Sequence, residues 1–258
     1  MKYKITLIAA ILFAFFLSSC EFNNNPVVTN SVTAQRKLLV ELSTSSTCTN
    51  CPPAENFLNQ IDSASGITSS DTSVVIIEFH TPIPTPGDPF YAQNMPASNA
   101  RKNFYDVQVN PTLLIGGSTK YIGFDAQSWT NSINIKLSQK ENYNLTFNIA
   151  YDTATRNGSV DISLLQTGGA NLSDLKLFIA VTENKLPFGT KFYHNVLRDF
   201  ITDANGDDMQ IAIGQPFSVT KNFVLNSIVT NPYNTNITVF AQSMSTKDVV
   251  VVARKKLL

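Results

Sequence analysis

The sequence predicts an α/β domain followed by an all-β domain built as an antiparallel sandwich. Three observations lead to this fold class. Strand-type and helix-type apolar patterns alternate from residue 37 to about residue 140, and from about residue 142 apolar residues recur at every second position. A Cys-x-x-Cys motif also stands where the first strand pattern passes into the first helix pattern. The change of period predicts two domains, 37–141 for the α/β part and 142–258 for the sandwich.

The residues before this region are expected to be a secretion signal and a tether. Two lysines precede the apolar run 5–17, which has the length of a signal-peptide core and is shorter than the roughly 20 residues of a membrane span. The run ends at Leu17-Ser18-Ser19-Cys20, which resembles the lipobox of bacterial lipoproteins. That resemblance implies cleavage after residue 19, a lipid on Cys20 and a polar tether over 20–36. The alternatives are an ordinary signal peptide with a chance cysteine, or an uncleaved anchor.

The charge balance argues against nucleic acid as a partner. The chain has 19 basic and 19 acidic residues, so its formal net charge is zero. Loss of residues 1–19 would remove two lysines and no acidic residue, which leaves the chain slightly acidic. A nearly neutral chain offers no electrostatic attraction to a phosphate backbone.

Short patterns predict the elements of the first part. Residues 38–42 form an apolar run of strand type. Residues 52–61 open with two prolines, which suit a first helical turn, and bring three apolar residues to one side. Residues 74–79 are rich in β-branched side chains, as in a strand buried on both faces.

The rest of the α/β part continues the alternation. Residues 81–96 hold five prolines and a glycine, which predicts a loop. Apolar residues at helical spacing mark 97–107, and strand patterns at 111–115 and 120–124 flank a Gly-Gly turn. A final helix pattern covers 129–137, so the predicted order is β-α-β-loop-α-β-β-α.

The second part has the pattern of an immunoglobulin-like or fibronectin-like sandwich. Apolar residues alternate with polar ones over 145–151 and 160–164, and Asn157-Gly158 between them predicts the hairpin turn. The same pattern recurs at 175–181, 211–213, 217–219, 223–225, 237–241 and 249–253. Roughly eight short strands with no helix pattern predict a sandwich.

The motif Cys48-Thr49-Asn50-Cys51 is the strongest chemical signal in the chain. A cysteine at a helix N-terminus is stabilised as a thiolate, and a second cysteine one turn on can resolve a mixed disulfide. A disulfide that closes so short a loop removes little entropy from the unfolded chain, which favours reactivity over a structural role. The alternatives are a structural disulfide or half of a zinc site. Zinc needs four ligands and only His80 and His194 could supply the others, so we expect no metal and no cofactor.

With this motif and order of elements, residues 37–140 resemble the thioredoxin-like superfamily. The resemblance implies that Pro111 takes a cis peptide bond and shapes a substrate groove beside Cys48; a trans loop proline is the alternative. It also implies an acidic proton relay for the second cysteine, for which Glu41 is the candidate unless its side chain faces solvent. Thr47 stands where the best-known members have tryptophan, and Thr-Asn replaces their Gly-Pro pair. The redox potential therefore cannot be carried over.

Nearly the whole of the chain after the tether resembles the outer membrane protein 28-related lipoproteins of Gram-negative envelopes. The resemblance is carried by Leu39-Val40-Glu41, the stretch Cys48 to Pro53, His80 with the stretch Pro86 to Tyr91, Asn110-Pro111-Thr112, the stretch His194 to Arg198, and the closing stretches Val239 to Gln242 and Lys247 to Val249. It implies an outer-membrane lipoprotein with this architecture rather than a particular reaction.

Other polar residues have weaker functional signals. His80 could approach Cys48 and tune it, but a hydrogen bond that anchors the proline-rich loop is the favoured interpretation. His194 and Arg198 are four residues apart in an alternating stretch, so we expect both on one face of a strand, as a structural polar cluster. The stretch 203–207 faintly resembles a calcium loop, but it lacks the later glycine and glutamate, so we expect an ordinary turn.

Two functions are compatible with these features. The first is a tethered thiol–disulfide oxidoreductase, in which Cys48 attacks, Cys51 resolves and Pro111 shapes the groove. Its partners would be the thiols and disulfides of envelope proteins. The second is a non-catalytic binding or scaffolding lipoprotein that recognises extended peptides. Both place the protein at the membrane through its lipid, and the direction of electron flow, the client, the membrane face and the oligomeric state stay open.

Overall fold

The computed structural model describes residues 36–64 and 73–258. The predicted secretion signal, the lipidation site at Cys20 and the tether up to residue 35 lie outside the described residues. Within the described ranges, no helix is both long enough and apolar enough to cross a membrane.

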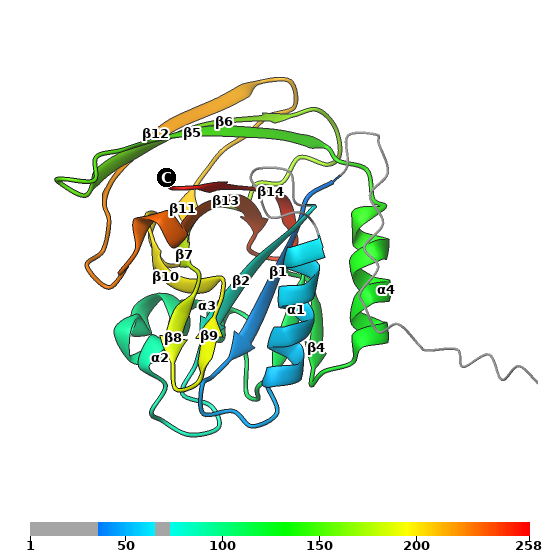
Figure 1. Cartoon of the computed structure of the whole chain (residues 1–258). Helices are drawn as coiled ribbons and strands as arrows, with labels where there is room; N and C mark the ends of the chain where they lie inside the picture. The colour runs from blue at the N-terminus through cyan, green and yellow to red at the C-terminus, as the bar shows by residue number, and fades with distance from the viewer. Residues whose placement is uncertain (1–35, 65–72) are drawn as a thin grey trace, which may run out of the picture.

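The first part of the chain has the predicted order of strands and helices (Figure 1). Its elements are β1 (Leu38–Thr44), α1 (Pro52–Ala64), β2 (Val74–His80), α2 (Pro89–Gln93), α3 (Met95–Phe104), β3 (Thr112–Ile115), β4 (Thr119–Ile122) and α4 (Ala126–Leu137). Helices α1 and α4 pack on one face of the sheet and α3 packs on the other, with a separate apolar cluster on each side. This arrangement confirms the α/β prediction for this region.

One helix was not predicted. Helix α2 lies inside the proline-rich stretch that we expected to be loop throughout. Pro89 occupies its first turn, where a missing N–H group costs nothing, and the Asp88 side chain caps the helix by accepting from the Tyr91 amide at 2.8 Å. Counting prolines as loop residues was wrong here because proline is also a favoured first residue of a helix.

The second part is built almost entirely of strands. They are β5 (Tyr143–Tyr151), β6 (Asn157–Gln166), β7 (Leu175–Glu183), β8 (Leu186–Phe188), β9 (Lys191–Tyr193), β10 (Val196–Phe200), β11 (Asp207–Asp208), β12 (Pro216–Val224), β13 (Thr235–Ser243) and β14 (Val249–Lys256), with a short 3-10 helix η1 (Pro232–Asn234). The strand predicted at 211–213 is wrong, since those residues form a loop and a turn. The patterns at 217–219 and 223–225 belong largely to one continuous strand, β12.

The predicted Asn-Gly hairpin turn is also wrong. Gly158 pairs with Tyr151 inside the β5–β6 ladder, and the turn is formed by residues 152–156. The Asp152 carboxylate closes this turn by accepting from the Ala154 amide at 2.9 Å and the Thr155 hydroxyl at 2.8 Å. A glycine is needed at 158 for packing, because the Phe223 ring occupies the space that a Cβ would take.

A nine-stranded sheet runs through both halves of the chain, in the order β14-β13-β7-β10-β2-β1-β3-β4, with β11 paired to β7. The junction between the halves is a parallel pairing of β10 with β2, where the Glu78 amide donates to the Asn195 carbonyl at 2.8 Å. Without β10, β2 would be an edge strand with unpaired backbone groups. The predicted boundary near residue 141 therefore coincides with the passage from α4 to β5 but does not divide the sheet.

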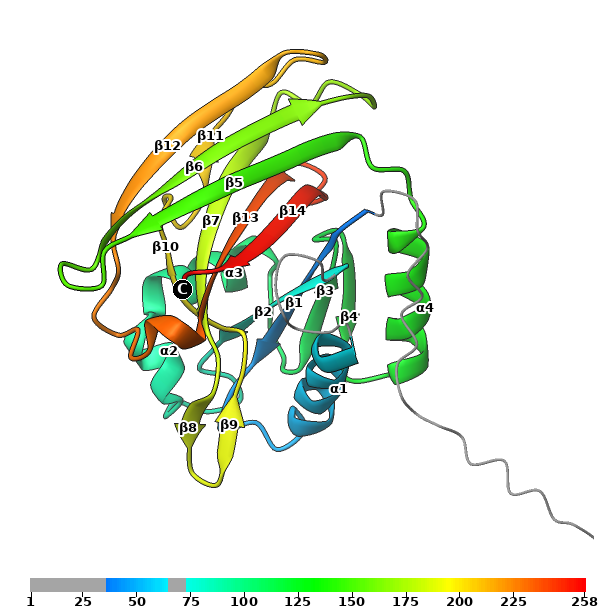
Figure 2. The same ribbon diagram turned by 45° about the horizontal axis from the view of Figure 1, so that its top comes forward.

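The second half of the chain forms two packed layers of strands. A three-stranded sheet, β12-β6-β5, lies over β7, β13 and β14 (Figure 2), and apolar residues from both layers fill the space between them. One layer of this sandwich is thus the continuation of the α/β sheet. Both layers come from the second half of the chain, but the sandwich is not a separate unit, because one layer continues through the β10–β2 pairing into the first half.

Candidate functional site

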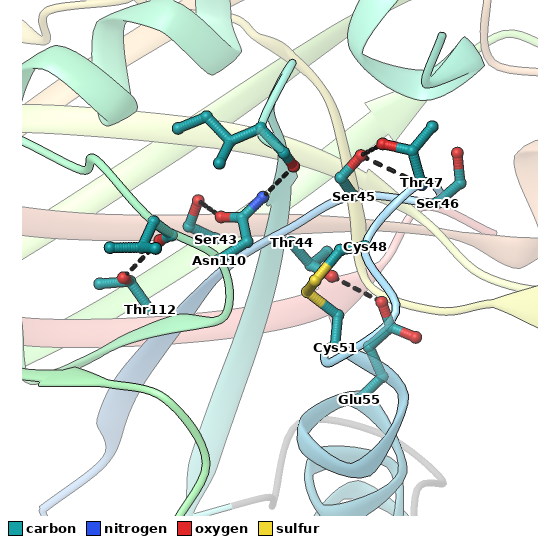
Figure 3. Close-up of a disulfide and its surroundings, with 12 residues drawn as sticks. Ser43, Thr44, Ser45, Ser46, Thr47, Cys48, Cys51, Glu55, Asn110 and Thr112 are labelled. Carbon is teal, nitrogen blue, oxygen red and sulfur yellow. Dashed lines mark hydrogen bonds between the residues drawn. A yellow bond between two sulfur atoms is a disulfide. The ribbon is translucent and has the colours of Figure 1, made fainter. Parts of the chain in front are cut away.

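Cys48 and Cys51 form a disulfide at the N-terminus of α1 (Figure 3). The Cys51 carbonyl accepts the first helical hydrogen bonds, from the amides of Ala54 at 2.9 Å and Glu55 at 3.1 Å. The disulfide therefore closes the loop that joins β1 to the first turn of α1. This confirms the predicted position of the motif between a strand and a helix.

The two sulfur-bearing residues differ in their access to solvent. Cys48 is 7% exposed, whereas Cys51 is fully buried. Both residues are thus buried, and Cys48 is the one that retains some contact with solvent.

The loop before Cys48 is held by the proline-rich loop. Asp88 accepts from the Ser46 amide at 2.5 Å and contacts Nδ1 of His80 at 2.7 Å. Burial raises the pKa of Asp88, but the hydrogen bond and charge interaction with His80 and the Ser46 and Tyr91 amides outweigh it and lower that pKa to about 2. His80 thus anchors the loop through Asp88, as the favoured interpretation of this residue expected.

The segment before β3 lies beside the end of β1 that leads to the disulfide. The Asn110–Pro111 peptide bond is cis, as the thioredoxin-like resemblance implies. The Asn110 side chain accepts from the Ser43 hydroxyl at 2.6 Å and donates to the Thr81 hydroxyl at 2.8 Å. Figure 3 shows Asn110 and the disulfide at the same end of β1. The pairing of Ser43 with Thr112 places Pro111 at the end of β1 that leads to the disulfide.

Glu41 does not share a face of the sheet with the disulfide. Its carboxylate is fully buried on the α3 side, where Arg101 donates to both of its oxygens, at 2.8 and 2.6 Å. The Tyr105 hydroxyl donates to the same carboxylate at 2.5 Å. Its neighbours Val40 and Leu42 point to the α1 side instead. The spacing between Glu41 and Cys48 in the sequence did not show which face of the strand Glu41 occupies. The register of β1 places the Glu41 side chain away from the proposed relay position.

Two carboxylates missed by the sequence analysis lie on the α1 face instead. Glu55, in the first turn of α1, accepts from the Thr44 hydroxyl at 2.5 Å. Glu78, in β2, is 1% exposed, and its Oε1 has no hydrogen-bond partner within the described part of the chain. Burial raises the pKa of Glu78 well above its ordinary value, and the charges of Glu55 and Asp62 raise it further. A glutamate inside a strand predicted to be buried on both faces was the signal that could have identified it.

The structure separates His194 from Arg198, contrary to the prediction of a shared face. Arg198 lies in β10, where its Nε is 3.2 Å from a Glu183 carboxylate oxygen. His194 lies before that strand, and Asn195 between them has a positive φ of 52°, which interrupts the alternation of side chains.

The stretch 203–207 is a hydrogen-bonded turn, in which the Asp203 carboxylate accepts from the Asn205 amide at 2.8 Å. Across residues 36–64 and 73–258, no three or more histidine, cysteine, aspartate and glutamate side chains are grouped so that they could hold a metal ion.

Comparisons with known proteins show a fold shared with solved structures. No protein-family model and no curated protein matches the chain. HBP35 of Porphyromonas gingivalis has a similar structure, with a TM-score of 0.70 and 15% identity over 87% of this chain and 76% of that chain. A protein of Agrobacterium tumefaciens has a TM-score of 0.59 and 16% identity over 88% of this chain and 96% of that chain. At such identities the similarity shows the fold alone.

A domain of the outer membrane lipoprotein Omp28 from Porphyromonas gingivalis also aligns with this chain. It has 15% identity over 45% of this chain and 88% of that chain, with a TM-score of 0.34. That score is too low to support an argument about either fold or function.

Proposed function

We propose that this protein is a thiol–disulfide oxidoreductase that is anchored in a bacterial cell envelope and acts on envelope proteins. The observation that carries the proposal is the placement of the Cys48–Cys51 disulfide. It stands at the start of α1, with Cys48 7% exposed and Cys51 fully buried, and with the cis-Pro111 segment at the same end of β1.

The reaction is an exchange between this disulfide and two thiols of a client protein. In the reducing direction, the Cys48 thiolate attacks one sulfur of a client disulfide, and the other client sulfur leaves as a thiolate. The Cys51 thiolate then attacks Cys48 in the mixed disulfide, which restores the Cys48–Cys51 bond and releases the second client thiolate. Two electrons pass from the cysteine pair to the client, and the reverse sequence oxidises a client dithiol. The relative reduction potentials of the two pairs decide the direction.

The helix terminus supports the chemistry of Cys48. Pro52 and Pro53 have no N–H to offer, and the Ala54 and Glu55 amides donate to the Cys51 carbonyl, so the dipole of α1 is what favours the thiolate over the thiol at its first turn. In this proposal an extended client segment would pair with the backbone of the residue before Pro111, since Pro111 itself has no N–H to donate.

The envelope location rests on the segment 17–20 and its likeness to a lipobox. A lipid on Cys20 would hold the folded part at a membrane through the tether 20–36 and bring it close to the thiols and disulfides of envelope proteins. In that oxidising compartment, a disulfide between Cys48 and Cys51 would persist until a client exchanges with it.

The test uses the chain from residue 20 onward with Cys20→Ser, so that Cys48 and Cys51 are its only thiols. Iodoacetamide should alkylate the reduced protein at pH about 6 faster than it alkylates a free cysteine, whose pKa is about 8.5. Oxidised glutathione should exchange with the reduced protein faster than with a simple thiol. Rates no higher than those of a simple thiol would refute catalysis.

A trapping variant separates this function from the alternative. Cys51→Ala should accumulate mixed disulfides with envelope proteins, and these should disappear when Cys48 is also replaced by alanine. Capture that persists without Cys48 would instead support a non-catalytic binding or scaffolding lipoprotein.

A further inference from the structure

A pocket of about 270 Å³ lies between the first turns of α1 and the hairpin formed by β8 and β9. Pro52 and Asn56 of α1 line one side of it, and Phe192 and Tyr193 of β9 line the other. Because Pro52 directly follows Cys51, the pocket adjoins the redox motif. Figures 1 and 2 show the hairpin and the start of α1 at the same end of the molecule.

Two carboxyl groups face this pocket, and one of them is buried without a partner. Glu55 and Glu78 both line it. The Oε1 atom of Glu78 accepts no hydrogen bond from the described residues, although the side chain is 1% exposed. A buried polar group without a hydrogen-bond partner costs free energy. A ligand that donates a hydrogen bond to this oxygen would therefore gain more binding free energy than it would at an exposed carboxylate.

Two nearby basic groups are engaged with other carboxylates of the described residues. Arg254 pairs with Asp62 at 2.8 Å, and His80 contacts Asp88 at 2.7 Å. Burial lowers the pKa of His194, which also lines the pocket, and the charge of Lys185 lowers it further, outweighing the opposing effect of Asp62.

Lys191 is the cation at the rim of the pocket. Its side chain is exposed, and it forms no ion pair within the described ranges of the chain. It can therefore compete with an incoming cation for the mouth of the pocket, but it leaves Glu78 unpartnered.

Acidic groups lie around one phenol on the pocket wall. Burial raises the pKa of Tyr193 to about 12, and the charges of Glu55, Asp88 and Glu78 contribute in the same direction. All three acidic groups therefore act on one phenol at the pocket surface. A cation at this wall interacts favourably with the ionised form of these groups, and an anion unfavourably.

An aromatic ring stands at the mouth of the pocket without a packing role. Phe192 is 65% exposed, whereas Tyr193, next to it, is buried in a cluster with Phe90, Leu186 and Val196. The cluster holds the hairpin against α2 and β10, so the exposed ring is carried on an anchored element. An exposed phenylalanine ring beside carboxyl groups can pack against the stem or the charged head of a basic side chain.

We propose that this pocket binds a lysine or arginine side chain of the client protein, close in sequence to the client cysteine that reacts with Cys48. Glu78 and Glu55 accept from the cation and Phe192 covers it. The inference rests on the proposed exchange reaction and goes beyond it by naming what the site selects. An acidic side chain would be repelled, and an apolar one would leave Glu78 without a partner.

The test compares exchange with peptides that differ in one residue. Each peptide is unstructured and has one cysteine, as a mixed disulfide with glutathione, and lysine, arginine, citrulline or glutamate one to four residues from that cysteine. At the spacing that gives the fastest reaction, the lysine or arginine peptide should react with the reduced protein about tenfold faster than the citrulline peptide. A tenfold ratio corresponds to a free-energy difference of about 1.4 kcal/mol. Glu78→Gln and Phe192→Ala should each reduce this ratio, and Lys191→Ala should increase it.

Controls separate the pocket from general electrostatics and from folding. Asp208→Asn removes one negative charge at a side chain that is 93% exposed, far in the fold from α1, and should leave the ratio unchanged. Phe192 is on the surface, so Phe192→Ala provides the test if Glu78→Gln does not fold. Equal rates for arginine and citrulline peptides at every spacing would refute the pocket, as would a preference that survives both Glu78→Gln and Phe192→Ala.

A binding measurement distinguishes failure of the pocket from failure of the proposed reaction. Fluorescence anisotropy with the Cys48→Ser, Cys51→Ser variant reports whether labelled lysine or arginine peptides bind better than citrulline peptides when no exchange is possible. Preferential binding without exchange in the wild type would support the pocket and refute the oxidoreductase. Exchange without any preference would support the oxidoreductase and refute the pocket.

Discussion

Replacing Glu41 by glutamine is expected to destabilise the fold strongly while leaving thiol exchange unaffected. The thioredoxin-like resemblance made Glu41 the candidate proton relay, whereas the structure places its carboxylate on the α3 face of the sheet, opposite α1. The two roles predict different results for one substitution. Glu41→Gln therefore tests the assignment of the two faces of β1 directly.

The expected loss in the free energy of unfolding follows from the contacts of Arg101. This guanidinium is 1% exposed and donates two charge-assisted hydrogen bonds to Glu41, at 2.8 and 2.6 Å. It also donates to Tyr105 at 2.7 Å and to Gln242 at 3.1 Å, and these neutral partners would remain. Removing one partner of a buried ion pair leaves an uncompensated charge and costs about 3–5 kcal/mol. Since domains are stable by only about 5–15 kcal/mol, the loss would be large.

Urea unfolding followed by tryptophan fluorescence measures this effect. Trp129 is the single tryptophan of the chain and is fully buried between α4 and the sheet, so its emission reports on the α/β core. The unfolding midpoint of Glu41→Gln should fall while the slope of the transition stays the same. The exchange rate with oxidised glutathione and its pH profile should match those of the wild type below the transition.

A double variant provides the control. Glu41→Leu combined with Arg101→Met removes both charges, and it should be less destabilised than Glu41→Gln because no buried charge is left unpaired. A loss below about 1 kcal/mol for Glu41→Gln would refute the reasoning, as would a shifted pH profile of exchange in a protein of unchanged stability.

Two further predictions concern the contact between the halves and the loop beside the disulfide. Gly117→Ala should cost about 2–4 kcal/mol in urea unfolding, because its Cβ would overlap the Lys247 carbonyl and its φ is +78°; Gly123→Ala, at +79° with open space around it, should cost about 1 kcal/mol. Similar costs for both alanine variants would contradict this packing. Asp88 has a pKa of about 2 in the folded protein against an ordinary value of 3.8, so its contribution to stability is complete above about pH 4 and is lost as the pH falls toward 2. Unfolding between pH 6 and 2 should therefore show a smaller loss of stability on acidification for Asp88→Asn than for the wild type, and parallel curves would refute the low pKa.

The sequence predicted the positions of individual strands and helices better than it predicted which strands pair. The short strands and helices between residues 38 and 137 follow from apolar periodicity and from prolines at helix starts, which act within a few residues. The errors at 157–158 and 211–213 have a different origin. Asn-Gly matched a common turn, but Phe223 of a distant strand needed a glycine at 158, and the alternating residues 211–213 found no partner strand. Tertiary contacts therefore overrode the local preference.

By itself, the sequence determined the order of elements in the α/β half, the cysteine pair at a strand–helix junction and the proline before β3, because each depends on neighbouring residues. Only the tertiary structure decided that β10 pairs with β2, that Glu41 faces α3, and that Glu78 and the β8–β9 hairpin meet at the first turns of α1. Strand pairing joins residues more than a hundred positions apart, and its register selects the face on which each side chain lies. No periodicity within one segment contains that information, since the same alternation fits either face of a sheet.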